Sequence, residues 1–112
     1  IAWGASDWTI CVGELDFSGE VPKVLNVRDV VTGEKPMKVY HADWSPCGKY
    51  LAFSRGPDQK ILGTIAEVVG AKAKGWNIGF ADAGQTNRWM PITTDGNCNK
   101  EPDWIPLPKE SP

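Results

Sequence analysis

The side chains that could support catalysis or bind a metal are few and widely spaced. The chain has one histidine, His41, which precedes Asp43 by two residues. A catalytic triad or a zinc site here would need partners from elsewhere, and the sequence contains neither HxxxH nor HExxH spacing. The three cysteines, Cys11, Cys47 and Cys98, are odd in number and form no CxxC pair, which argues against a zinc site and against a disulfide framework. The sequence therefore predicts a protein without catalytic or metal-binding residues of its own.

An acidic segment near the C-terminus has the spacing of a calcium loop. Asp95, Asn97 and Asn99 place oxygen-bearing side chains at alternate positions, from which they can converge on one ion. However, Lys100 occupies the position of the loop glycine, and no Glu lies at the twelfth position. We therefore interpret residues 95–99 as an Asx-rich turn. The sequence also lacks a Gly-x-Ser-x-Gly elbow, a P-loop and a Gly-x-Gly-x-x-Gly motif, and we predict no cofactor.

Length and composition indicate one small globular domain. The chain has 112 residues, of which 41% are hydrophobic and 23% charged. Its formal net charge of -2 gives no reason to expect nucleic acid as a partner. No apolar run approaches the roughly 18 residues that a membrane helix needs, so we expect no membrane insertion. Because the chain starts at Ile1 without Met, inside an expected strand, we interpret it as part of a longer protein or as a processed product.

Six tryptophans are a high number for this length, and most of them recur at equivalent positions of an internal repeat. The expected strand that contains Trp8 matches the one that contains Trp76, and Asp43-Trp44-Ser45-Pro46 returns as Asp103-Trp104-Ile105-Pro106. Trp3 similarly matches Phe53. We assign these side chains to packing between the repeated units. Trp89 has no counterpart, and together with its neighbour Arg88 it is the predicted partner contact.

The repeats predict a series of short strands joined by turns. Ile1 to Asp16 reads as two strands around a turn at residues 4–7, and the spacing of Trp8, Ile10 and Val12 by two predicts one buried face. Pro91 confines the last strand to an edge or a bulge. Further strands are expected at residues 24–31, 37–41, 49–55, 76–82 and 88–93, with turns at residues 83–87 and 94–99. Residues 57–75 are expected to form an inserted loop.

Three segments resemble the TolB-like, or WD40-like, β-propeller repeats. Residues 41–55, HADWSPCGKYLAFSR, look like the family's Trp-Ser-Pro-Asp-Gly-Lys signature, although Cys47 stands where Asp is usual. Residues 93–106, TTDGNCNKEPDWIP, resemble the approach to the next signature, which here stops at Pro106, and residues 76–84, WNIGFADAG, resemble an inner strand. The resemblance implies an all-β partial propeller of four-stranded antiparallel blades. Residues 1–106 would then supply about two blades, and residues 107–112 a proline-rich tail.

The residue types of the signature predict a structural role. The Asp43 and Ser45 side chains can cap backbone N–H groups of a turn, Pro46 fixes φ, and Gly48 supplies a positive φ. Trp44 is large enough to fill the space between adjacent sheets. The same role is expected of the later copy and of the two repeated tryptophans in the expected strands, namely Asp103, Trp104, Pro106, Trp8 and Trp76.

The function that the sequence favours is that of a non-catalytic protein-binding or scaffolding module, not an enzyme. Its partners would be another protein or the remaining blades of a larger propeller. The alternative is an accessory propeller segment of a larger enzyme, a peptidase or an oxidoreductase, whose catalytic residues lie outside this chain. A third hypothesis is a homo-oligomer in which three identical chains close a six-bladed ring. The resemblance also implies a bacterial protein in a periplasmic or extracellular setting.

Overall fold

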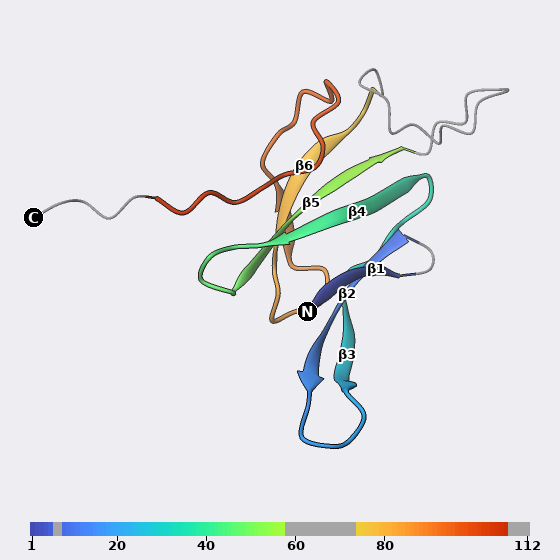
Figure 1. The fold of residues 1–112 in the computed structure, drawn as a ribbon. Coiled ribbons are helices and arrows are strands. Elements are labelled where there is room, and N and C mark those ends of the chain that lie inside the picture. Colours follow the sequence, from blue (N-terminus) through green and yellow to red (C-terminus); the bar gives the residue numbers. More distant parts are fainter. Residues whose placement is uncertain (6–7, 58–73, 108–112) are drawn as a thin grey trace, which may run out of the picture.

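The computed structural model describes residues 1–5, 8–57 and 74–107, and over these ranges the chain is all-β, as predicted (Figure 1). The strands form a three-stranded sheet in the order β1-β2-β3 and a four-stranded sheet in the order β4-β5-β6-β7, and all pairs are antiparallel. No helix of the described part is long and apolar enough to span a membrane. The strand bounds are β1 Ala2–Ala5, β2 Thr9–Asp16, β3 Lys23–Val31, β4 Met37–Trp44, β5 Tyr50–Pro57, β6 Asn77–Asp82 and β7 Trp89–Pro91.

The expected strands are all present, but some bounds differ. The turn expected at residues 4–7 starts later, because Gly4 and Ala5 belong to β1 and pair with Ile10 and Thr9 of β2. β4 continues to Trp44, because Asp43 pairs with Ala52 and Trp44 pairs with Leu51. The Asp-Trp pair therefore ends a strand, and the turn itself begins at Ser45. The last strand is shorter than residues 88–93 and ends at Pro91. Most of the expected loop at 57–75 and of the tail at 107–112 lies outside the described residues.

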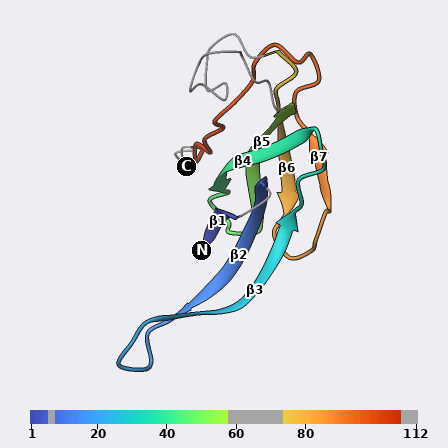
Figure 2. The ribbon, with the colours of Figure 1, turned by 90° about the vertical axis from the view of Figure 1, so that its right-hand side faces the viewer.

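The core lies between the two sheets (Figure 2). Ile10 and Val12 of β2 face Leu51, Phe53 and Ala81 of the second sheet, and the exposed fraction of each of these side chains is 5% or less. The prediction of one buried face on β2 was too simple, since Cys11 on the opposite face is also buried. Burial of such apolar side chains contributes about 1.5–3 kcal/mol each and holds one sheet on the other.

The β1–β2 and β5–β6 pairs share one register. Trp3 pairs with Cys11, and Phe53, 50 residues after Trp3, pairs with Gly79, 68 residues after Cys11. In each of these pairs, a large aromatic side chain lies opposite a small residue. The remaining pairs obey the same offsets: Ala2 with Val12 and Ala52 with Phe80, Gly4 with Ile10 and Ser54 with Ile78, Ala5 with Thr9 and Arg55 with Asn77.

Polar contacts from the turn between β6 and β7 also join the sheets. Asn87 N donates to Val30 O at 2.7 Å, and Thr86 Oγ1 donates to Asp29 O at 2.7 Å. The Asn87 carboxamide oxygen accepts from Thr32 N at 2.9 Å. Asn87 has a φ of 56°, a conformation that Asn adopts more readily than most residues. The turn at residues 83–87 thus fixes β3 against the second sheet.

Candidate functional site

The signature turn is built by Ser45, which is 5% exposed. Its hydroxyl accepts from Tyr50 N at 3.1 Å, while Gly48 N donates to Ser45 O at 2.9 Å. Gly48 has a φ of 74°, which is available to Gly without steric cost, and Pro46 is exposed. These contacts close the turn from β4 into β5 and are structural in nature.

Asp43 has a different partner from the one its position in the signature suggests. Its carboxylate accepts from the backbone N of Trp104 at 2.9 Å, and Trp104 Nε1 donates to Asp43 O at 3.0 Å. The aspartate therefore holds the second copy of the signature and does not cap its own turn. Asp103 and Pro106 of that second copy are exposed.

The repeated tryptophans do not share one environment. Trp76 is 5% exposed and meets the Tyr40 ring edge-on, with 5.3 Å between the ring centroids. Trp44 is half-buried against the core between the sheets. Trp8, which we predicted to pack between the units, is 40% exposed, and Lys38 Nζ lies 4.1 Å from its ring centroid. That prediction was wrong because Trp8 has a φ of 56° and precedes β2, so it does not follow the alternation of the strand.

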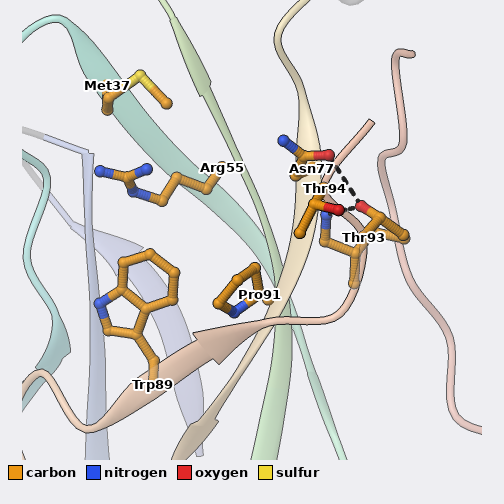
Figure 3. A pocket seen from close by; sticks show the side chains of 9 residues that line it. Met37, Arg55, Asn77, Trp89, Pro91, Thr93 and Thr94 are labelled. Carbon is orange, nitrogen blue, oxygen red and sulfur yellow. Dashed lines mark hydrogen bonds between the residues drawn. The ribbon is translucent and has the colours of Figure 1, made fainter. Parts of the chain in front are cut away.

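A groove at one end of the second sheet contains Trp89, the tryptophan without a counterpart (Figure 3). The register places Arg55 beside Asn77, two residues from the Phe53 and Gly79 pair, so the groove opens on the same face as Phe53. The cavity has a volume of about 240 Å³. We call it the Arg55–Trp89 groove; it is lined by Met37, Arg55, Asn77, Ile78, Gly79, Trp89, Pro91, Thr93 and Thr94.

Contacts with neighbouring residues fix the orientation of the side chains that line the groove. The Arg55 guanidinium lies 4.9 Å from the Trp89 ring centroid, a cation–π arrangement, and Phe53 supports the indole edge-on at 5.6 Å. Asn77 Oδ1 accepts from Thr93 Oγ1 at 3.1 Å and from Gly96 N at 3.0 Å. Because the oxygen is used in this way, the Asn77 NH2 group is left as a donor, and Figure 3 shows it turned away from Thr93.

The structure separates the two residues of the predicted partner contact. Trp89 lines the groove, whereas Arg88 is 67% exposed, does not line it, and places Nη1 3.8 Å from Asp82 Oδ2. The arginine that accompanies Trp89 is Arg55, from a distant part of the sequence. The pattern of alternating residues in residues 49–55 could have placed Arg55 on the Phe53 face, but no sequence signal connected β5 to β7.

The residues that could have formed a calcium loop, and the single histidine, lie in ordinary surroundings. Asp95 Oδ1 accepts from Asn97 N at 2.9 Å and from Asn99 Nδ2 at 2.7 Å, and these hydrogen bonds lower the pKa of the Asp95 carboxyl. Residues 95–99 thus form an Asx turn in which one amide group points its nitrogen, not its oxygen, at Asp95. His41 is exposed with a φ of 54°, at the irregularity in the β4–β5 register. Among the described residues, no three His, Cys, Asp or Glu side chains gather as a metal site would require.

The thiols of Cys11 and Cys47 lie in contrasting surroundings. Cys11 is buried and its Sγ donates to Asp29 Oδ1 at 3.2 Å; burial raises the pKa of this thiol, and the hydrogen bond with Asp29 adds to the rise. Cys47 is exposed in the signature turn, 3.3 Å from Ser45 Oγ. The hydrogen bond with Ser45, followed by that with the backbone of Lys49, lowers the pKa of Cys47.

A scan against protein-family models found no match. Searches of the curated proteins and of the solved structures found none either.

Proposed function

We propose that this chain is a non-catalytic segment of a TolB-like β-propeller and that it binds a protein partner through the Arg55–Trp89 groove. Support for repeated blades comes from the register, because the β1–β2 pairs reappear in β5–β6 under the same two offsets. A four-stranded antiparallel meander such as β4–β7 is also the unit from which propellers are built. A periplasmic or extracellular location belongs to the same proposal.

The observation that supports the binding proposal most directly is the environment of the Arg55 guanidinium. Its guanidinium is stacked on Trp89 and, among the described residues, has no carboxylate partner. Stacking leaves the edge of the guanidinium available for a carboxylate, which it can bind with two parallel hydrogen bonds. Asn77 adds an amide donor beside it, while Met37 and Pro91 supply apolar walls. The groove therefore suits an extended peptide segment that presents one Asp or Glu side chain between apolar neighbours.

The binding proposal is tested by titrating the isotope-labelled chain with a capped pentapeptide, Thr-Val-Glu-Val-Thr, and with the same peptide carrying Gln in place of Glu. We expect the acidic peptide to shift the NMR signals of the Trp89 indole N–H and the Asn77 NH2 with a Kd of about 1 mM or below. Equal shifts with the Gln peptide, or no shifts with either, would reject the groove as a carboxylate site.

Two arginine variants supply the matched control. Arg55→Gln should abolish the preference for the acidic peptide, because it removes the charged donor from the groove. Arg88→Gln removes an arginine that is adjacent to Trp89 in sequence but lies outside the groove, and should leave the preference intact. Loss in the Arg88 variant alone would place the binding surface on the other side of β7.

A further inference from the structure

Each sheet has an outer face that no described strand covers. On the first sheet, the side of Gly13 is filled by Trp3 and Val24, and Leu15 pairs with Val24 on that face. Leu15 is 51% exposed and Val24 is 46% exposed. These two, with Trp3, form an apolar surface on the side turned away from the second sheet, and we call it the first outer face.

The second sheet has an apolar surface on the side turned away from the first. Phe80 pairs with Met90 there, and Tyr50 meets the Phe80 ring edge-on at 6.1 Å. Met90 is 54% exposed and Tyr50 is 39% exposed. We call these residues the second outer face. Beside them, residues 96–104 cross the same sheet, and Glu101 N donates to Ser54 Oγ at 2.7 Å.

The shared register makes these two outer faces counterparts of faces that already pack together inside the chain. Phe80 is the counterpart of Val12, which is buried against the second sheet. Trp3 is the counterpart of Phe53, which is buried against the first. The second outer face thus corresponds to one half of the internal interface, and the first outer face corresponds to the other half.

The edges of the sheets show the same complementarity. β5 pairs with β4 through Asp43 opposite Ala52 and Trp44 opposite Leu51. β1, the counterpart of β5, pairs only with β2 among the described residues. The counterpart of the Asp43-Trp44 pair is the second signature at residues 103–106, which pairs with no strand in the described part of the chain. Beyond Trp104 this segment leaves Ile105 82% and Leu107 90% exposed.

We propose that copies of this chain associate head to tail, with Asp103 and Trp104 of one copy pairing with the start of the chain in the next. The register of β4 on β5 places Asp103 opposite Ala2 and Trp104 opposite Ile1 of the neighbouring copy. The second outer face of the first copy then packs on the first outer face of its neighbour. The donated residues extend the β1 edge of the three-stranded sheet, and the interface is heterologous, so it builds rings or open chains. This assembly rests on the repeat architecture of the proposed function.

The test uses two variants that block opposite sides of the interface. Met90→Glu charges the second outer face, and Leu15→Glu charges the first outer face. Both positions are more than half exposed, so neither change should disturb folding, which circular dichroism checks. Val21→Glu is the control, since Val21 is 67% exposed in the loop between β2 and β3 and outside the proposed interface.

Sedimentation and light scattering over a range of concentrations measure the association. We expect the wild type and the Val21 variant to assemble beyond a dimer, and each blocked variant to associate at least roughly tenfold more weakly. A mixture of the two blocked variants retains one functional interface per pair and should stop at a one-to-one dimer. A monomeric wild type, or a mixture that does not form the dimer, would overturn the proposal.

Failure of the assembly can be told apart from failure of the proposed function. The Arg55–Trp89 groove is not part of the interface, so the peptide titration can be repeated on the Leu15 variant. Selective binding of the acidic peptide by a chain whose wild type stays monomeric would reject the assembly alone.

Discussion

Replacing Gly79 by Ala tests how tightly the strands of the second sheet are packed. Gly79 pairs with Phe53, and a Cβ added at Gly79 would lie 2.7 Å from Cζ and 3.1 Å from Cε2 of that ring. Non-bonded carbon atoms prefer separations of about 3.5–4.0 Å, so the Phe53 ring would have to move. Phe53 is fully buried and Trp89 packs edge-on against it, which leaves the ring little room.

The expected loss follows from two opposing effects. Overpacking a buried site costs about 1–3 kcal/mol, whereas removing a glycine from a strand interior contributes about 0.5–1 kcal/mol of stability. We therefore expect Gly79→Ala to lower the free energy of unfolding by about 1–2 kcal/mol. Gly4→Ala is the matched control, because Gly4 lies in β1 with nothing within 4 Å of an added Cβ. It should raise the free energy of unfolding by up to about 1 kcal/mol.

Urea unfolding, followed by circular dichroism and tryptophan fluorescence, measures both changes. Phe53→Leu shortens the side chain that causes the clash. The loss of unfolding free energy in the double variant should therefore be about 1 kcal/mol smaller than the sum of the losses in the two single variants. If Gly79→Ala stabilised the protein as much as Gly4→Ala, or if the losses with Phe53→Leu added fully, the inferred contact between Gly79 and Phe53 would be refuted.

Other predictions concern the thiols and the polar contact between the sheets. Cys47 should react with iodoacetamide at lower pH than Cys11, because hydrogen bonds lower the pKa of Cys47 while burial raises that of Cys11; mass spectrometry of the peptides gives the order of labelling. The stability linked to Cys11 is present below the pKa of the unfolded thiol and is lost as the pH rises through the raised pKa of the folded state, so Cys11→Ala should flatten the alkaline decline in the free energy of unfolding. Asn87→Ala should lower that free energy by about 1–3 kcal/mol, because it removes the acceptor for Thr32 N and places Ala at a positive φ. Asn87→Gly removes the same hydrogen bonds but tolerates the positive φ. If denaturant melts show the same loss of unfolding free energy for the Ala and Gly variants, strain of Ala at the positive φ would be excluded as a cause.

Local patterns predicted the strands well, because alternation and turn residues act over a few positions. They could not predict that β4 continues through Trp44, since that extension depends on pairing with Leu51 in the next strand. They also could not place Arg55 beside Trp89, because those residues meet only after β5, β6 and β7 have paired in order. The partner of Asp43 was missed for the same reason, as its hydrogen bond reaches Trp104, 61 residues along the chain.

Trp3 connects the register of the strands to the proposed assembly. In both sheets a large aromatic side chain pairs with a small residue, Trp3 with Cys11 and Phe53 with Gly79. Phe53 fills the space between the sheets, whereas Trp3 lies half-buried on the outer side, where the edge of its six-membered ring and Val24 lie beside Gly13. An outward-facing aromatic at a position whose counterpart is fully buried suits a surface that another sheet covers. If the head-to-tail interface forms, Trp3 enters the same environment as Phe53, and its indole should become inaccessible to a quencher such as acrylamide as the copies associate.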